Sequence, residues 1–259
     1  MIISILNMKG GVGKTTTTLN LGYALAQQGY KTLLIDNDPQ GNLTTGIGIE
    51  EYEQTVTDTY LNGILPIHQL SEKLHVIPAD ITLSTVYNEL SNKVDANFRL
   101  FKSLKAVNKD YDYILIDNRP DAGILASNSI LASDQFMYLV KSGDAYSLNG
   151  ILTFEEIIEE QVKPLLELQG RNINLLGVLI NQTKNTNVSQ HIEDQLVDYF
   201  KEKVFDTKVR INSAIQEAVV LKISVIEHAP KSNGALDFTT LAHEVVKRTK
   251  GKKATIQTA

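Results

Sequence analysis

The stretch of this sequence with the clearest chemistry is residues 7–16, which read Asn-Met-Lys-Gly-Gly-Val-Gly-Lys-Thr-Thr. The apolar run at residues 2–6 predicts a buried parallel strand before it, and residues 17–28 have a helix-compatible apolar pattern after it. This is the context of a phosphate-binding loop, because glycines let backbone N–H groups point at phosphate oxygens and the helix N-terminus adds its dipole. In such a loop Lys14 contacts the β- and γ-phosphates and the Thr15 hydroxyl binds Mg²⁺.

This interpretation assigns nucleotide contacts to the second part of the loop. The residues are Gly10, Gly11, Val12, Gly13, Lys14, Thr15 and Thr16. The standard pattern, G-x-x-x-x-G-K-T, needs a glycine at position 8, whereas this chain has Met8. A second lysine, Lys9, follows it. The loop is therefore a phosphate-binding loop of unusual sequence.

The order Lys-Gly-Gly-x-Gly-Lys-Thr resembles the deviant Walker A loop of the ParA/MinD family of ATPases. In that family the first lysine reaches across a dimer interface to the nucleotide on the other subunit. By position, the resemblance gives this role to Lys9. The alternative is a solvated surface lysine in a P-loop of the ordinary kind. Two further motifs favour the family.

The second motif follows residues 31–36, which predict another buried strand, and it reads Asp-Asn-Asp-Pro-Gln-Gly-Asn at residues 36–42. Asp36 and Asp38 thus lie at the carboxyl end of a strand, where open α/β sheets bind ligands, and a metal- or water-handling role follows. The alternative is an Asx-rich turn closed by the proline. The string resembles the family's second motif, which implies that Asp38 positions the attacking water. We assign Asp36 to the metal.

The third motif is the strand expected at residues 111–117, which ends in Asp117. An acidic residue there can hold a water bound to Mg²⁺. In the family a small residue and two prolines usually follow, whereas this chain has Asn-Arg-Pro-Asp at residues 118–121. Arg119 has three interpretations: it stabilises charge in the transition state, it distorts the segment and slows turnover, or it is a surface arginine.

Residues for the base are expected after a later strand, which ends at Asn181. The donor and acceptor of its amide make Asn181 a candidate for reading adenine, and related enzymes have an adenine-contacting asparagine after this strand; a turn-forming asparagine is the alternative. Val209 and Arg210, followed by Glu-Ala at residues 217–218, resemble the family's segment that closes over the base. The run Ala-Pro-Lys-Ser-Asn-Gly-Ala at residues 229–235 resembles another family motif.

The elements that must position these residues follow from the remaining apolar patterns. Further strands are expected at residues 74–79, 135–140 and 173–180, and helices at 81–90, 96–107, 124–131, 146–168 (interrupted near Pro164), 188–200 and 236–248, with one short helix between 50 and 63. The fold class is therefore α/β: a doubly wound, mostly parallel sheet with helices on both faces, as in P-loop NTPases. We expect one domain at residues 1–249 and a basic, disordered tail at residues 250–259.

Composition excludes several classes of protein. With 42% hydrophobic and 21% charged residues, neither a disordered nor a membrane protein is indicated. No apolar run approaches the roughly 20 residues that span a bilayer, and no basic segment precedes the first apolar run, so a signal peptide is not expected. The absence of cysteine excludes disulfides and thiolate-bound clusters, and with them a nitrogenase iron protein. We expect a cytoplasmic bacterial protein.

Charge is distributed unevenly along the chain. Residues 201–259 contain 11 Lys and Arg against 6 Asp and Glu, whereas residues 1–200 contain 14 against 24. A basic C-terminal region on an acidic body predicts a localised anionic partner. Non-specific contacts with DNA phosphates are expected there. The candidates outside the tail are Lys201, Lys203, Lys208, Arg210, Lys222, Lys231, Lys247 and Arg248.

The resemblance implies a function with two alternatives. We favour a ParA-type ATPase that uses ATP and Mg²⁺, hydrolyses ATP slowly, dimerises on ATP and binds DNA non-specifically. With a ParB-like or small centromere-binding partner it would segregate plasmid or chromosomal DNA, on the nucleoid when ATP-bound. The alternatives are a MinD-type membrane-associated positioning ATPase and a metabolic P-loop enzyme such as a dethiobiotin synthetase. No stable membrane anchor is expected, because Ile256 is the one large apolar residue of the last nine. The chain starts directly at the first strand, so no N-terminal helix-turn-helix domain is expected.

Overall fold

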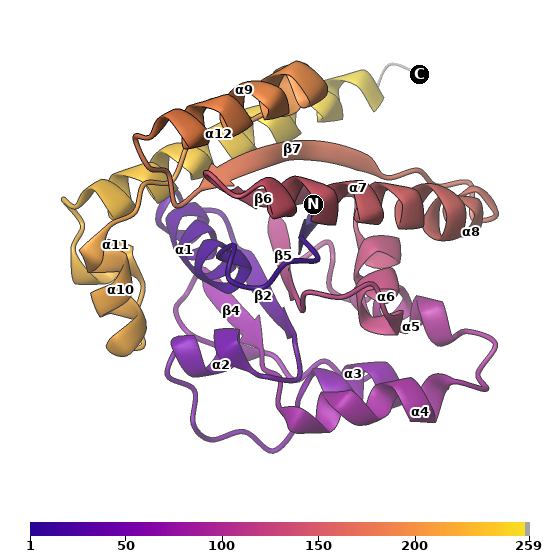
Figure 1. The fold of residues 1–259 in the computed structure, drawn as a ribbon. Helices are drawn as coiled ribbons and strands as arrows, with labels where there is room; N and C mark the ends of the chain where they lie inside the picture. Colours follow the sequence, from indigo (N-terminus) through magenta and orange to yellow (C-terminus); the bar gives the residue numbers. More distant parts are fainter. Residues whose placement is uncertain (257–259) are drawn as a thin grey trace.

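The computed structural model describes residues 1–256, with side chains other than those of residues 145–148 and 251–256. Within this range, seven strands form one sheet in the order β3-β4-β2-β5-β1-β6-β7 (Figure 1). The strands are β1 (Ile2–Leu6), β2 (Thr32–Asn37), β3 (His68–Gln69), β4 (Leu74–Ile77), β5 (Tyr113–Asn118), β6 (Gln135–Lys141) and β7 (Asn174–Asn181). Every neighbouring pair is parallel except β3 with β4. The doubly wound parallel sheet that the sequence predicts is confirmed.

Helices connect these strands and cover both faces of the sheet. The α-helices are α1 (Lys14–Gln27), α2 (Asn42–Gly46), α3 (Val56–Asn62), α4 (Val86–Leu90), α5 (Arg99–Leu104), α6 (Ile124–Ala132), α7 (Ala145–Ile157), α8 (Lys163–Glu167), α9 (Asn187–Phe200), α10 (Ser213–Val220), α11 (Val225–His228) and α12 (Asn233–Ile256). Single 3₁₀ turns are η1 (Ile81–Thr85), η2 (Ala96–Phe98) and η4 (Lys201–Lys203), and η3 (Ile158–Val162) is a π-helical turn.

The strands read as continuous apolar runs because both faces of the sheet are buried. In β2, Leu34 packs on the face covered by α1 and α12, whereas its neighbours Leu33 and Ile35 pack on the other face beneath α3 to α6. The β6–β7 side of that second face is covered by helices α6 to α9. Alternating apolar side chains therefore enter two separate core layers, and the sheet lies between them.

Four short elements and the C-terminal tail differ from the sequence prediction. The short elements β3, α2, α10 and α11 were not predicted, because two to eight residues carry too little apolar periodicity. A disordered tail was expected from residue 250, whereas helix α12 continues to Ile256, and residues 257–259 lie outside the described range. The helix expected at residues 146–168 is interrupted as predicted. Pro164 has no N–H to donate to the preceding turn, and the π-helical turn η3 lies directly before it.

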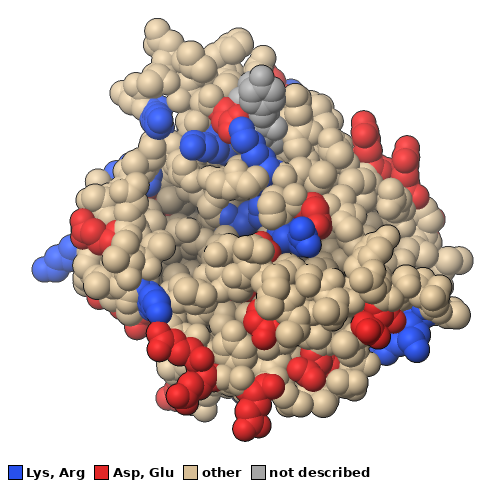
Figure 2. Space-filling view, turned by 60° about the horizontal axis from the view of Figure 1, so that its bottom comes forward, with Lys and Arg blue, Asp and Glu red and all other residues tan. Residues whose placement is uncertain are grey.

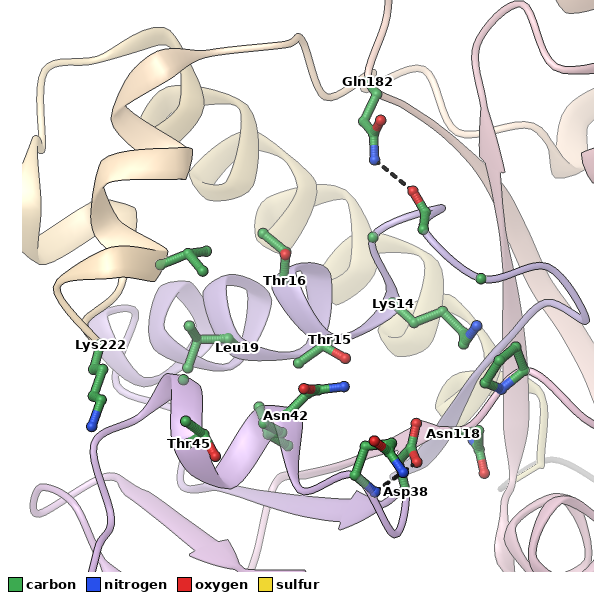
Figure 3. A pocket seen from close by; sticks show the side chains of 18 of the residues that line it. Lys14, Thr15, Thr16, Leu19, Asp38, Asn42, Thr45, Asn118, Gln182 and Lys222 are labelled. Carbon is green, nitrogen blue, oxygen red and sulfur yellow. Dashed lines mark hydrogen bonds between the residues drawn. The ribbon is translucent and has the colours of Figure 1, made fainter.

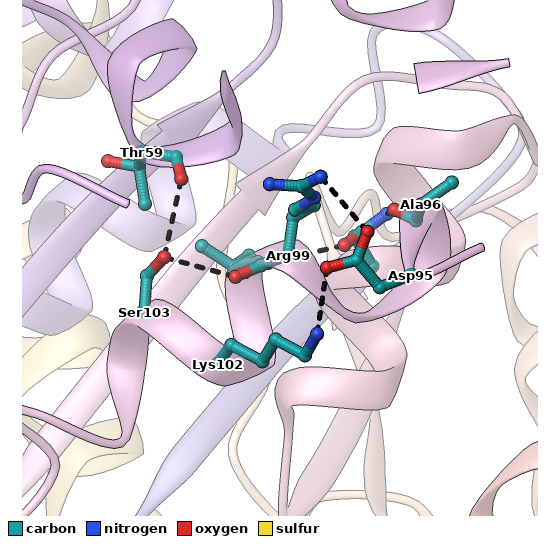
Figure 4. Close-up of polar contacts among 8 residues, drawn as sticks. Thr59, Asp95, Ala96, Arg99, Lys102 and Ser103 are labelled. Carbon is teal, nitrogen blue, oxygen red and sulfur yellow. Dashed lines mark hydrogen bonds and ion pairs between the residues drawn. The ribbon is translucent and has the colours of Figure 1, made fainter. Parts of the chain in front are cut away.

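Charged and polar side chains join the helices of the second face (Figure 4). Asp95 forms ion pairs with Arg99 at 2.9 Å and with Lys102 at 2.7 Å, and so holds the start of α5. Ser103 of α5 donates to the carbonyl of Thr59 in α3 at 3.3 Å. These contacts fix α3 and α5 over the half of the sheet that contains β2 and β5. None of the helices within residues 1–256 has both the length and the hydropathy to cross a bilayer.

We expect the first core layer to depend on the packing of α12. Phe238 is completely buried there, whereas Leu236 on the same helix is half exposed. Phe238→Ala should lower the free energy of unfolding by about 3–5 kcal/mol, since it leaves a cavity. Leu236→Ala, the control on the same helix, should lower it by less than about 1 kcal/mol. Urea denaturation measures both, and equal losses would contradict this account of the core.

Candidate nucleotide-binding site

The loop between β1 and α1 leaves the start of the helix open to a ligand. Gly13 precedes α1 with φ +92°, a left-handed conformation that favours glycine. Among the described residues no side chain caps this helix end, and no acidic residue lies in its first turn. The first N–H groups of a helix have no intrahelical partner, and together with the dipole they bind anions. The loop therefore presents unused donors to a phosphate group.

Lys14 places a cation at the same point. Its Nζ donates to the carbonyl oxygens of Asn7, at 3.0 Å, and Lys9, at 3.2 Å, and its side chain is buried. Burial lowers the pKa of Lys14, and the negative charges of Asp117 and Asp38 oppose this effect. The ammonium group thus lies inside the loop, among carboxylates, where it can meet phosphate charge.

The end of β7 holds the loop from behind. Asn181 donates from Nδ2 to the Val12 carbonyl at 2.8 Å, and Gln182 donates from Nε2 to the Gly11 carbonyl at 2.9 Å. A Cβ at Gly13 would lie 2.3 Å from Nδ2 of Asn181, so this contact requires glycine. Asn181 is buried against the loop and does not line the pocket, whereas Gln182 does. Adenine recognition by Asn181 stays a prediction.

Asp36 and Asp117 lie side by side, because they are register partners on β2 and β5. Asp36 is buried and accepts hydrogen bonds from the N–H and hydroxyl of Thr44 at 2.9 and 2.8 Å, and from the N–H of Asp38 at 3.2 Å. Burial raises the pKa of Asp36 to about 6. These contacts hold the segment after β2, and the assignment of Asp36 to the metal stays a prediction.

Asp117 differs from Asp36 because both of its oxygens are buried without a hydrogen-bond partner among the described residues. Burial, followed by the charge of Asp36, raises its pKa to about 8. An unpartnered buried carboxylate calls for an explanation, and a bound cation or its water is a common one. Asp117 is thus the strongest candidate among the three carboxylates for interacting with a cation.

A pocket of about 670 Å³ opens in front of the loop (Figure 3). Lys14 and Thr15 point from α1 toward the side of the pocket formed by Asp38 and Asn118, and Lys222 lies at its far end. Asp38 is half-buried, and its Oδ1 accepts a hydrogen bond from the N–H of Gln40 at 3.0 Å. The P-loop, Asp38 and the segment after Asp117 therefore share one pocket, as their motifs predict.

The residues present fit a nucleotide-bound magnesium ion. Mg²⁺ keeps several waters and takes one or two protein oxygens together with phosphate oxygens. The described residues contain no cage of three or more carboxylate or histidine side chains, which agrees with this mode of binding. The Thr15 hydroxyl at the pocket and the unpartnered Asp117 behind it are the oxygen donors the ion would use.

Lys9 lies at the outer edge of the loop. Its Nζ forms an ion pair with Asp144, which lies between β6 and α7, and its backbone N–H donates to Oδ1 of Asn7 at 2.8 Å. The Lys9 side chain is 39% exposed. It does not line the pocket of its own chain. The role across a dimer interface that the resemblance gives to Lys9 stays a prediction.

Arg119 is held away from the pocket by its own segment. Its Nε forms an ion pair with Asp121 at 2.6 Å, and Asn118 and Pro120 line the pocket instead. This geometry favours the interpretation of Arg119 as a surface arginine. Val209 is buried, and Arg210 is bound to Asp237 through both its side chain and its N–H, so neither reaches the pocket in this conformation.

Most of the basic C-terminal residues are already engaged within the chain. Lys203 donates to the Leu175 carbonyl, Lys208 pairs with Glu193, Arg210 with Asp237, Lys222 with Glu50 and Arg248 with Glu244. The five that are engaged have less free charge to offer, and contact of the eight candidates with DNA stays a prediction. Lys201, Lys231 and Lys247 are exposed and have no hydrogen bond or ion pair among the described side chains. Figure 2 shows the local mixing of signs: basic side chains gather near the upper centre of this face and acidic ones mainly along its lower margin.

Several residues of the pocket were not predicted from the sequence. Its far wall comes from α2 and from the end of α10. These residues are Asn42, Leu43, Thr45, Val219, Val220 and Lys222. The signal in the sequence was weak, because α2 and α10 are short and their residues reach the pocket through the tertiary fold. Gln182, directly after Asn181, could have been found from its position at a strand end.

The fold and this pocket define a P-loop nucleotide-binding protein, because the glycine loop follows a central parallel strand and opens a helix. Comparison with known proteins narrows the class. The AAA domain family matches residues 1–169. The chain is 36% identical to sporulation initiation inhibitor protein Soj of Bacillus subtilis, covering 94% of this chain and 97% of that one. It is 34% identical to chromosome partitioning protein ParA of Caulobacter vibrioides, with 98% and 96% covered.

A solved structure agrees with these relatives. The septum site-determining protein MinD of Pyrococcus horikoshii, in complex with Mg-ADP, superposes with a TM-score of 0.77 at 24% identity, over 94% of this chain and 95% of that one. This likeness confirms the fold. The chain belongs to the ParA/MinD family, which the loop sequence with its second lysine resembles.

We expect Gly13→Ala to disrupt the loop. The added Cβ would meet the Asn181 amide at 2.3 Å, and the φ of +92° disfavours a side chain. Binding of a fluorescent ATP analogue should weaken by at least about tenfold, equivalent to ~1.4 kcal/mol. Gly123→Ala is the control, because its added Cβ would make only ordinary contact, at 3.6 Å from Asp121, and Gly123 does not line the pocket. Equal binding by Gly13→Ala and the parent protein would contradict this geometry.

The second prediction for this site concerns pH. The pKa of Asp117 is about 8 in the folded chain, against 3.8 for an ordinary aspartate, so the folded state keeps a proton that the unfolded state releases. This carboxyl group therefore lowers the free energy of unfolding progressively as the pH rises from about 4 to 8. Asp117→Asn removes that linkage. Its free energy of unfolding, relative to the parent, should rise across this range and level off above pH 8.

Urea denaturation at several pH values, without nucleotide or Mg²⁺, measures this difference. Asp134→Asn is the control, because Asp134 lies away from the pocket and accepts a hydrogen bond from the N–H of Ile2 at the start of β1. A difference between Asp117→Asn and the parent that stays constant with pH would show that Asp117 is ionised in the folded chain.

Proposed function

We propose that this protein is a ParA-type ATPase, one domain over residues 1–249, that dimerises on ATP and binds DNA non-specifically. With a ParB-like or small centromere-binding partner it segregates plasmid or chromosomal DNA, associating with the nucleoid when ATP-bound. The observation that carries the proposal is the pairing of two loop lysines. Lys14 lies inside the loop, and Lys9 lies at its outer edge, outside the pocket of its own chain. The names of the relatives, Soj and ParA, support the same conclusion.

Different residues of the pocket have different roles in ATP hydrolysis. The N–H groups at the start of α1 and the Lys14 ammonium bind the phosphates. Asp38, half-buried at the pocket, orients the attacking water, since phosphoryl transfer depends mainly on positioning and charge stabilisation. Thr15 and Asp117 would hold Mg²⁺ and its water, and the ion neutralises charge on the phosphate oxygens. We expect slow hydrolysis in the absence of a partner, because slow turnover suits a timing switch better than a metabolic enzyme.

Dimerisation follows from the position of Lys9. In the single chain, the charge of Lys9 is balanced by Asp144. In the dimer, Lys9 would leave Asp144 and contact the phosphates of the nucleotide bound to the second subunit, and so complete the site of that subunit. Each subunit would then supply a cation to the other, which makes association dependent on ATP. A dimer also doubles the exposed lysines available to DNA.

We expect Lys9→Ala to bind ATP with near-parent affinity and to lose the ATP-dependent dimer, because Lys9 lies outside its own pocket. Sedimentation velocity with ATP and with ADP measures the dimer, and calorimetry measures binding. Lys73→Ala is a matched control, because Lys73 is also partly exposed and paired with an acidic residue, at 3.9 Å from Glu72. A Lys9→Ala protein that still dimerises on ATP would refute the role of Lys9.

DNA binding should depend on both nucleotide and salt. Binding to random-sequence duplex should be stronger with ATP than with ADP, and log K should fall with log salt by about 0.9 per phosphate contacted. Removing the three exposed, unpaired lysines should flatten this slope, whereas removing three exposed lysines from the acidic part should leave it nearly unchanged. The test variant combines Lys201→Ala, Lys231→Ala and Lys247→Ala, and the control combines Lys73→Ala, Lys93→Ala and Lys109→Ala.

Fluorescence anisotropy over a salt series measures these slopes. Equal slopes for the two triple variants would show that Lys201, Lys231 and Lys247 do not contact the DNA phosphates. Binding to vesicles that contain anionic lipid, with no binding to duplex under any nucleotide, would overturn the ParA-type function in favour of the MinD-type alternative.

A further inference from the structure

Two asparagines follow the two carboxylates of the site. Asn37 follows Asp36 at the end of β2, and Asn118 follows Asp117 at the end of β5. They are register partners in the parallel pair, so they leave the sheet at the same level. Both side chains are buried, and nothing in the nucleotide-binding motifs requires an amide at either position.

The two amides form a closed hydrogen-bond network. Nδ2 of Asn37 donates to Oδ1 of Asn118 at 2.9 Å and to the Leu125 carbonyl at 3.1 Å. Nδ2 of Asn118 donates to the carbonyls of Ile5 and Ile116, each at 3.2 Å. Backbone carbonyls only accept, so these contacts fix which end of each amide carries the donors. The remaining oxygen, Oδ1 of Asn37, accepts from the hydroxyl of Tyr60 at 2.8 Å.

This network holds the residues on both sides of residues 119–124, which include the Arg-Pro-Asp sequence that departs from the family pattern. Residues 119–124 lie between Asn118 and Leu125, and Asn37 binds both of those residues through one NH₂ group. Asn118 also ties β5 to β1, the strand that leads into the P-loop. A single side chain on β2 thus holds both flanks of the segment that contributes Pro120 to the pocket.

The carboxylates of the site depend on this support. Asp117 has no hydrogen bond of its own among the described residues, so its position is set by the backbone on either side of it. Asp38 directly follows Asn37, and its Oδ1 is held only by the nearby N–H of Gln40. Hydrolysis requires both groups at fixed positions, since misplacement of about 1 Å can cost a hundredfold in rate.

We propose that Asn37 is a positioning residue for ATP hydrolysis, whose amide fixes the ends of β2 and β5 and both flanks of residues 119–124, and so holds Asp38 and Asp117 relative to each other. This inference rests on the proposed ATPase activity. Asn37 does not line the pocket, and it acts through Asn118 and through the backbone. ATP affinity, which comes from the loop and α1, should therefore change little when Asn37 is replaced.

The test compares Asn37→Leu, which keeps the number and branching of the side-chain heavy atoms but removes the amide, with Asn128→Ala. Asn128 is a matched control: its side chain is also fully buried, with two donated bonds to the Ala96 and Ile124 carbonyls and one accepted from the Leu100 N–H, away from the pocket. For each protein we would measure melting temperature, affinity for a fluorescent ATP analogue, and kcat for hydrolysis with saturating ATP and Mg²⁺.

Asn37→Leu should lower kcat at least tenfold with the affinity within threefold of the parent, whereas Asn128→Ala should lower the melting temperature and leave kcat within twofold. Asn118→Ala, a small residue as in the family, should also lower kcat. The double variant should lower kcat no further than Asn37→Leu alone, because the two residues form one unit. If Asn37→Leu does not fold, Asn37→Ala, which removes the same amide without adding volume, provides the same comparison of kcat with affinity.

Three outcomes would overturn the inference: a parent-like kcat in Asn37→Leu, an equal loss of kcat in Asn128→Ala, or a loss of affinity as large as the loss of kcat. In each of these the parent protein hydrolyses ATP, so the proposed function stands. A parent protein that binds but does not hydrolyse ATP would overturn the proposed function, and the role of Asn37 with it.

Discussion

The site depends on one buried electrostatic arrangement. Lys14 is a buried cation, and the buried carboxyl groups of Asp36 and Asp117 lie across from it at the ends of neighbouring strands. Isolated charges are costly inside a protein unless they are paired or hydrogen-bonded. Lys14 is stabilised by two loop carbonyls and Asp36 by Thr44, whereas Asp117 has the Lys14 charge and the Thr15 hydroxyl nearby but no well-formed hydrogen bond among the described residues. The buried Lys14 and the uncapped start of α1 therefore present positive charge at the pocket, and the phosphates of a nucleotide are the kind of ligand that this arrangement binds.

The parallel sheet makes this arrangement possible. Because β1, β2 and β5 are adjacent and parallel, their carboxyl ends open at one edge, and the residue types needed for phosphate and metal chemistry meet there although they are far apart in sequence. The apolar runs that form the strands have no chemical role themselves. They set the register, which pairs Asp36 with Asp117 and Asn37 with Asn118. The packing of the core strands therefore also determines the geometry of the site.

Sequence patterns predicted the features that are local in the chain and missed those that arise from tertiary contacts. Continuous apolar runs predicted every long strand, and the loop sequence predicted the positions of Lys14 and Thr15 at the pocket. The wall formed by α2 and α10, the partner of Lys9 and the pairing of the C-terminal basic residues were not predicted. Each of these depends on residues brought together from distant segments. The charge count of the C-terminal region was correct, but it could not show that four of the basic side chains, Lys208, Arg210, Lys222 and Arg248, pair with carboxylates.

The most direct test of the nucleotide site is isothermal titration calorimetry with ATP, with and without Mg²⁺, on the parent protein and on Lys14→Ala. Since the buried ammonium lies at the start of α1, we predict one ATP per chain for the parent, with tighter binding when Mg²⁺ is present. Lys14→Ala should bind at least about tenfold more weakly, a difference of ~1.4 kcal/mol or more. Equal, Mg²⁺-independent affinity in the two proteins would contradict the assignment of this pocket to a nucleotide.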